Sequence, residues 1–272
     1  MTRWESLHWV ESRATAIATL LLLLGVTIVA EVGCGGGSKP ASATGLLEGN
    51  WQITLIPHGS TLQPVYTGFL LQKGPNVSGS VILGDGCSGV GTVTGKFDGQ
   101  NVTLGIQEFG QDISLNGSMP SGSASLSGQY STLAGACGGN STGTWTAVQV
   151  KPLAGAFHGT FTSLNATLTV TGTLTQGANI GASTATVSGN ITATGTVICS
   201  YLTSASIRGV ISGTVLNVDF YDSKGNIIGQ IPTTAQPALL TPDATSLSGS
   251  YSFGAISGSC FGDNGGVQLS FP

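Results

Sequence analysis

An internal repeat constrains this chain more than any other feature of its sequence. Both halves open with the pattern Leu-x-Gly-x-aromatic, at Leu47–Trp51 and at Leu153–Phe157. Five further motifs recur in the same order: Gly68–Gln72 with Gly172–Gln176, Val77–Gly79 with Val187–Gly189, Gly95 and Gly99 with Gly209 and Gly213, Ser125–Ser131 with Ser246–Ser252, and Cys137–Gly143 with Cys260–Gly266. A shared order over six motifs predicts two copies of one structural unit. The chain therefore divides into β domains at residues 46–150 and 152–272, with the boundary near Lys151-Pro152.

Each unit has the two-residue periodicity of β-strands. Trp51, Ile53 and Leu55 alternate with the polar residues Gln52 and Thr54. This alternation is typical of an antiparallel sheet with one packed and one solvated face. In the first unit, segments of this kind recur at 48–57, 64–72, 77–83, 89–97, 100–108, 111–117, 123–130 and 142–150.

This pattern predicts an all-β protein. Gly, of which the chain has 43, and β-branched Thr and Val are poor helix formers. About eight short strands per unit favour a small antiparallel barrel or a two-sheet sandwich. Two tandem barrels are the preferred interpretation because closure leaves no sheet edge exposed. A single larger sheet shared by both units is the alternative.

The N-terminal 34 residues predict export and anchoring. Met1–Arg13 is polar and is followed by Ala14–Ala30, an uncharged and largely apolar stretch. Cys34 then follows a glycine and precedes a Gly/Ser-rich segment, an arrangement that resembles bacterial lipoprotein signals. The resemblance implies a signal peptide at residues 1–33, lipid attachment at Cys34 and a flexible tether at residues 34–45. An uncleaved membrane anchor and ordinary secretion remain alternatives.

The cysteine count agrees with an exported protein. The chain has five cysteines, and lipidation of Cys34 leaves four. An even number in an oxidising compartment favours disulfides. Because each unit owns one early and one late cysteine, we predict the bridges Cys87–Cys137 and Cys199–Cys260. Four buried free thiols are the alternative.

Two family resemblances bear on function. The opening Gly49-Asn50-Trp51 resembles the lipocalin-like G-x-W motif. The chain as a whole resembles Gly/Ser/Thr-rich repeat lipoproteins of bacterial envelopes. The second resemblance implies a lipid-anchored protein of the cell envelope that faces the periplasm or the exterior, with the outer membrane as the expected location. It implies this location but no particular activity, and the leading hypothesis is a structural or interaction role rather than an enzymatic one.

The lipocalin-like resemblance leads to an alternative function. A carrier of a small apolar ligand needs an open barrel cavity, here lined by residues such as Trp51, Ile53, Leu104, Leu126 and Tyr130. In a barrel of eight strands, however, inward side chains can fill the interior completely.

The residues for catalysis are sparse. The part of the chain after Cys34 has two histidines, His58 in an expected turn and His158 on an expected strand, both interpreted as solvated. Gly139–Gly143 matches G-x-S-x-G but precedes a strand rather than a helix. No sequence pattern predicts a metal site or a cofactor. We therefore expect a non-enzymatic protein.

The low charge limits the expected classes of binding partner, and loop length indicates where a partner could bind. Charged residues make up only 7% of the chain, so nucleic acid is an improbable partner. The membrane, through the lipid, is the first expected partner, and an envelope protein or a small apolar ligand is the second. Ile231–Asp243 is longer than its counterpart Met119–Gly122, and Ala238-Leu239-Leu240 within it is a candidate binding loop. The alternative is a neutral insertion that packs on the barrel end.

Overall fold

The computed structural model describes residues 46–83, 89–108, 110–135, 139–164, 167–180, 184–194, 203–232, 237–254 and 262–272. The predicted signal peptide, Cys34 and the other four cysteines lie outside these residues. Lipidation of Cys34 and the two disulfides therefore stay predictions. No helix within the described ranges is long and apolar enough to cross a membrane.

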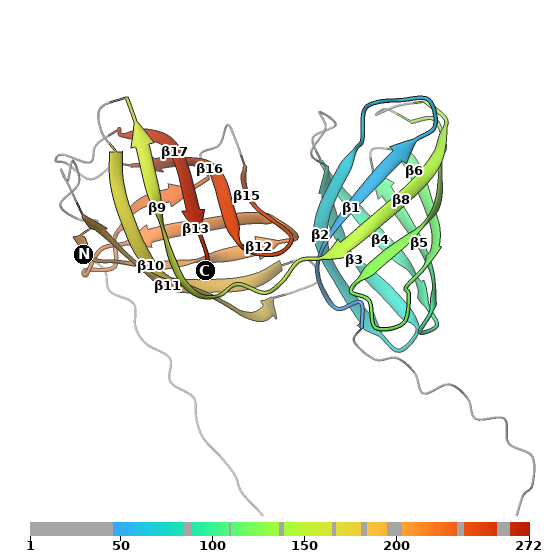
Figure 1. The fold of residues 1–272 in the computed structure, drawn as a ribbon, viewed down its shortest axis with the longest axis horizontal. Coiled ribbons are helices and arrows are strands. Elements are labelled where there is room, and N and C mark those ends of the chain that lie inside the picture. Colours follow the sequence, from blue (N-terminus) through green and yellow to red (C-terminus); the bar gives the residue numbers. More distant parts are fainter. Residues whose placement is uncertain are drawn as a thin grey trace, which may run out of the picture. The chain divides into compact units, whose positions relative to one another are not determined.

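The first unit is a closed antiparallel barrel of eight strands (Figure 1). Each strand pairs with the next, and the last pairs with the first, through partners such as Ile53 and Ala147. The strands are β1 (Gly49–Pro57), β2 (Val65–Lys73), β3 (Asn76–Leu83), β4 (Val90–Phe97), β5 (Asn101–Glu108), β6 (Gln111–Ser118), β7 (Ser125–Thr132) and β8 (Ser141–Gln149). The eight strands expected from the sequence periodicity are confirmed.

The second unit repeats this architecture with one strand in two pieces. Its strands are β9 (Ala154–Ser163), β10 (Thr167–Ile180), β11 (Thr184–Thr194), β12 (Ala205–Ser212), β13 (Val215–Tyr221), β14 (Ile227–Ile231), β15 (Ala238–Leu240), β16 (Ser246–Phe253) and β17 (Asn264–Ser270). The pairing of β12 with β13 closes the ring. β14 and β15 both pair with β13 on one side and β16 on the other, so together they fill one strand position. The prediction of two tandem barrels is confirmed, and a single shared sheet is not formed.

The strand alternation places one apolar core inside each barrel. In the first barrel, Trp51 and Trp145 are fully buried among the aliphatic side chains of the other strands. In the second, the ring of Phe161 stacks on Tyr251 with centroids 4.8 Å apart, and Phe220 and Phe253 pack beside them. Each barrel is thus stabilised by inward-facing aromatic and aliphatic residues.

The repeat motifs occupy equivalent places in the two barrels. Gly49 and Gly155, at the start of each unit, both have positive φ, +141° and +135°. The next residues in the motif, Trp51 and Phe157, are both buried. One expected pair is displaced by a residue: Tyr130 pairs with Gly143, and its counterpart Tyr251 pairs with Gly265 rather than with the expected Gly266.

The two barrels belong to one compact unit, Lys39–Pro272. The connection between them is short, because β8 ends at Gln149 and β9 begins at Ala154. Val150 and Leu153 within this connection are buried in the hydrophobic core of the second barrel. The linker is therefore packed rather than free.

Candidate functional site

The barrel interior offers no space at the residues expected to line a ligand cavity. Trp51, Ile53, Leu104, Leu126 and Tyr130 are each at most 4% exposed and belong to one packed cluster. A void large enough for a water molecule beside them would leave part of their surface accessible. These side chains therefore fill the first barrel.

The residues with catalytic potential lie apart from one another. His58 is exposed in the turn after β1, and His158 is exposed on the outer face of β9. Ser141 of the G-x-S-x-G sequence begins strand β8, and its Oγ lies 2.9 Å from the hydroxyl of Tyr130. Within the described residues, no three His, Cys, Asp or Glu side chains are grouped as metal ligands would be.

The turn aspartates serve the backbone of their own turns. Oδ1 of Asp98 accepts hydrogen bonds from the backbone N–H groups of Gln100 and Asn101. Oδ1 of Asp222 accepts from the N–H groups of Lys224 and Asn226. Hydrogen bonds from the Asn101 and Asn226 side chains, and then these backbone bonds, lower the pKa of both carboxyl groups. Both residues therefore act as hairpin caps.

The structure differs from the loop expected at Ala238-Leu239-Leu240. These residues form strand β15, and Ala238 and Leu240 are buried in the core of the second barrel. Leu239 faces outward and is 45% exposed. The length of Ile231–Asp243 indicated a loop, but the alternating burial shows that Ala238 and Leu240 complete the barrel wall.

A packing surface that the sequence did not predict lies on strand β2. Tyr66 and Leu70 face the interior of the first barrel, whereas Thr67, Phe69 and Leu71 face outward. Phe69 is only 2% exposed because it packs into the core of the second barrel. The outward face of β2 is thus an interface between the two barrels.

Buried hydrogen bonds join the barrels beside Phe69. Oδ1 of Asn50, a residue that is 2% exposed, accepts a hydrogen bond of 2.8 Å from the N–H of Gly213. Oγ1 of Thr67 accepts from both the N–H and the hydroxyl of Thr214. Because unpaired polar groups are costly when buried, these bonds fix the two surfaces in one register.

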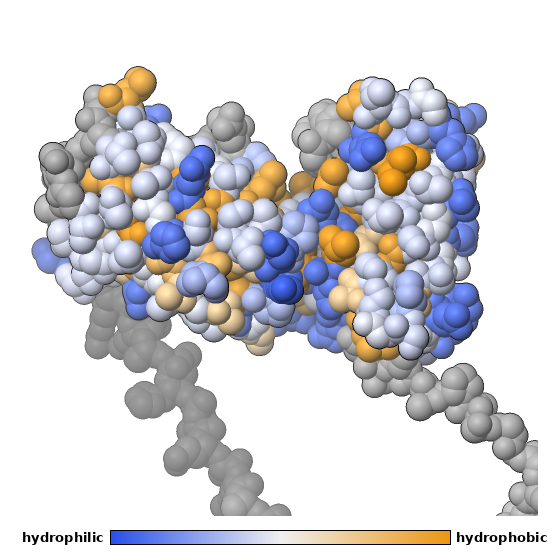
Figure 2. All heavy atoms as spheres, in the orientation of Figure 1, coloured by the Kyte–Doolittle hydropathy of each residue, from blue (hydrophilic) through white to orange (hydrophobic). Residues whose placement is uncertain are grey.

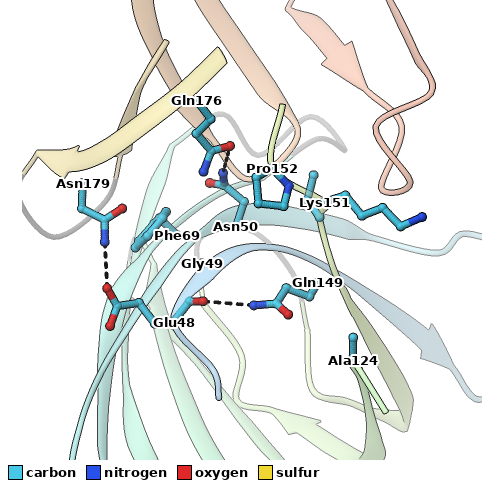
Figure 3. Close-up of a pocket in the computed structure, with 11 residues that line it drawn as sticks. Glu48, Gly49, Asn50, Phe69, Ala124, Gln149, Lys151, Pro152, Gln176 and Asn179 are labelled. Carbon is cyan, nitrogen blue, oxygen red and sulfur yellow. Dashed lines mark hydrogen bonds between the residues drawn. The ribbon is translucent and has the colours of Figure 1, made fainter. Parts of the chain in front are cut away.

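A cleft opens at the edge of this interface (Figure 3). Its volume is about 410 Å³, within the range of about 300–1,000 Å³ that is typical of small-molecule sites. The lining comes from both barrels and includes the amide side chains of Asn50, Gln149, Gln176 and Asn179. The cleft is therefore the candidate binding site of the described structure.

Hydrogen bonds across the cleft hold its walls. Nδ2 of Asn50 donates to Oε1 of Gln176 at 3.3 Å, and Nδ2 of Asn179 donates to Oε1 of Glu48 at 3.0 Å. Nε2 of Gln149 donates to the carbonyl of Glu48 at 3.0 Å. Figure 3 shows these side chains grouped around Phe69. The amides of Gln149, Gln176 and Asn179 each keep one further polar group that can meet a ligand, whereas both polar groups of Asn50 are already bonded.

The outer surface of the barrels is polar but weakly charged. Outward positions along β10 are occupied by Thr167, Thr169, Thr171, Thr173 and Thr175, all exposed. Figure 2 shows the corresponding pale surface, with apolar side chains dispersed over the visible face. Such a surface suits contacts made through hydrogen bonds rather than through strong charge.

Comparisons with known proteins give no family for this chain. No model of a known protein family matches the sequence, and no curated protein matches it. The site must therefore be interpreted from its own residues.

Proposed function

We propose that this chain is a non-enzymatic envelope lipoprotein, tethered through Cys34 and acting as an interaction module through its outer surface. The observation that carries this proposal is the filled interior of the first barrel, where Trp51 and Leu104 are at most 1% exposed. With that interior occupied by side chains, a partner has to be met outside the barrel, and the cleft at the interface offers polar and apolar groups for it.

The tether is tested by metabolic labelling. The full chain is expressed in a bacterial host with a radiolabelled fatty acid, next to the Cys34→Ser variant. We expect label and membrane association in the native chain, and loss of the label in the variant. A labelled Cys34→Ser protein, or an unlabelled native chain, contradicts the lipoprotein proposal.

Native mass spectrometry tests the interaction role against the carrier alternative. The sample is Ala41–Pro272, which retains every strand, exported to an oxidising compartment and purified without detergent. We expect no tightly held apolar molecule. A co-purifying apolar mass that disappears on denaturation would favour the lipocalin-like carrier instead.

The same spectrum tests the disulfide prediction. Bridges Cys87–Cys137 and Cys199–Cys260 lower the mass by about four hydrogen atoms, and peptide mapping identifies the partners. Each bridge closes a long loop and is expected to stabilise its barrel by roughly 4 kcal/mol. Detection of four free thiols, or of a bridge between the two barrels, contradicts the prediction of one bridge per unit.

A further inference from the structure

The cleft between the barrels has walls that are set before any ligand arrives. Asn50, Thr67 and Thr214, which are 2%, 7% and 4% exposed, are buried and hydrogen-bonded across the interface beside the cleft. Phe69 is inserted next to them. A site with fixed walls loses little conformational entropy on binding, so even weak polar contacts contribute to affinity.

The polar groups of the lining are a mixture of donors and acceptors. Oε1 of Gln149 and Oδ1 of Asn179 are acceptors that have no partner among the described residues, and Nε2 of Gln176 is a donor in the same position. A hydroxyl group both donates and accepts a hydrogen bond. A ligand that carries several hydroxyls can therefore satisfy all three amides at once.

The charge of the lining favours a neutral ligand. Glu48 and Lys151 are its charged residues, so the formal charges cancel. A phosphate or a carboxylate would be expected to meet an arginine or several cations, and a cation would be expected to meet several carboxylates.

Apolar groups complete the lining without making it a hydrophobic pocket. Phe69, Ala124 and Pro152 supply carbon surface between the amides (Figure 3). The ring of a sugar has the same division, with C–H groups on its faces and hydroxyls around its edge. An entirely apolar ligand would instead leave the amides desolvated and unpaired. An extended peptide would gain from an open strand edge, which the closed first barrel lacks.

Gln176 has different hydrogen-bond partners from its repeat counterpart, Gln72. Its counterpart Gln72 serves its own barrel, since Oε1 accepts from the N–H of Leu47 and Nε2 donates to the carbonyl of Gly74. The side chain of Gln176 instead meets Asn50 of the other barrel at the edge of the cleft. The same residue type at the same repeat position thus has an internal role in one unit and a cleft role in the other.

We infer that the cleft binds a short neutral saccharide segment of a size that fits about 410 Å³. This inference rests on the proposed function, because it names the ligand class of a surface interaction module. Gln149, Gln176 and Asn179 bind the hydroxyls, and Phe69, Ala124 and Pro152 contact the C–H groups.

The test is a binding screen of Ala41–Pro272, which contains both barrels, against neutral oligosaccharides of two to four sugars. Anionic oligosaccharides and tripeptides of mixed sequence form the comparison sets. The strongest neutral ligand is then titrated by calorimetry into the double variant Gln149→Ala/Asn179→Ala. Gln107→Ala and Asn217→Ala, which remove exposed amides outside the cleft, are the matched controls.

We expect a neutral oligosaccharide to bind, the double variant to bind at least tenfold more weakly, and both controls to stay within twofold of the native protein. Circular dichroism and thermal unfolding confirm that each variant is folded. Affinity that rises with chain length indicates an internal segment of a polymer, and equal affinity for the disaccharide indicates a free sugar.

Three results would overturn the inference. The first is that the folded protein binds no neutral oligosaccharide at millimolar concentration. The second is that the cleft variant and the control variants lose affinity equally. The third is that the protein prefers anionic oligosaccharides or peptides. The proposed function is judged separately, because labelling at Cys34 does not depend on what the cleft binds.

Discussion

At the scale of single residues, two equivalent tyrosines have different partners in the two barrels. The hydroxyl of Tyr130 lies 2.9 Å from Oγ of Ser141, whereas that of Tyr251 donates to Oδ2 of Asp263 at 2.8 Å. Burial and the Asp263 carboxylate raise the pKa of Tyr251 well above its usual value. Oδ1 of Asp263 is buried and has no hydrogen-bond partner among the residues that the structure describes. The second barrel therefore depends on the tyrosine hydroxyl more than the first.

Tyr251→Phe is expected to destabilise the protein more than Tyr130→Phe. The first change leaves a buried carboxylate with one contact fewer and costs about 1.5–3 kcal/mol, the range for hydrogen bonds to charged groups. The second removes a bond between neutral hydroxyls and costs about 0.5–1.5 kcal/mol. Urea denaturation of both variants measures the difference, and equal losses would show that Asp263 has other means of compensation.

Asp243 is expected to make stability depend on pH below 4. Hydrogen bonds from Thr241 and from the side chain and N–H of Thr245 lower its pKa to about 2 from 3.8. Because the unfolded chain takes up the proton first, the folded protein keeps the full contribution above about pH 4 and loses it as the pH falls towards 2.

Thermal unfolding of Asp243→Asn between pH 2 and 7 measures this contribution. We expect the native chain and the variant to differ most above pH 4 and to converge near pH 2, because asparagine can keep the acceptor but does not titrate. Asp112→Asn, on the exposed face of β6, is the control. A difference in stability that stays constant from pH 2 to 7 would mean that the charge of Asp243 does not contribute to the stability.

At the scale of elements, the turn between β12 and β13 fits the surface of β2 so closely that only glycine is accommodated. Gly213 has φ +59°, and a Cβ there would lie 2.0 Å from Oγ1 of Thr67 and 2.2 Å from the backbone nitrogen of Gly68. A side chain at this position would have to push the two barrels apart.

Gly213→Ala is therefore expected to weaken the interface. Gly225 is a matched control, since its φ is +84° and a Cβ would meet nothing within 4 Å. Both substitutions strain the backbone, but only the first adds a clash, which we expect to cost a further 1–3 kcal/mol or so, as overpacking does. Chemical denaturation compares the two variants. Equal destabilisation would show that the contact relaxes freely.

The strands were predictable from the sequence, whereas the interface was not. Alternation over eight or nine residues, as in β1 and β5, reports which face is buried. The outward residues Phe69 and Leu71 match Thr173 and Thr175 in the repeat, and this exchange of exposed threonines for apolar residues was the signal that could have revealed the interface. This signal is ambiguous, because a strand with apolar residues on both faces is also typical of a strand that is buried within a single domain.

The cleft and strand β15 escaped sequence interpretation for different reasons. The cleft joins Glu48 to Asn179 and Asn50 to Gln176, pairs that are 126 or more positions apart and carry no shared periodicity. β15 has only three residues, too few for alternation to be recognised.

At the scale of the whole molecule, the two barrels share one architecture but contribute different surfaces to their interface. The first barrel supplies the apolar face of β2, and the second supplies the turn at Gly213 that fits it. The counterparts of these two surfaces, the exposed threonines of β10 and the turn at Gly99, carry different residues, so the halves are not interchangeable. The chain is thus a single assembly rather than two independent modules in series.

The divided strand of the second barrel marks a position where we expect the chain to tolerate an insertion. β14 and β15 each pair with β13 on one side and with β16 on the other, so each piece of the divided strand is held by its own hydrogen bonds. An epitope tag inserted between β14 and β15 would therefore leave the described pairings of both pieces in place.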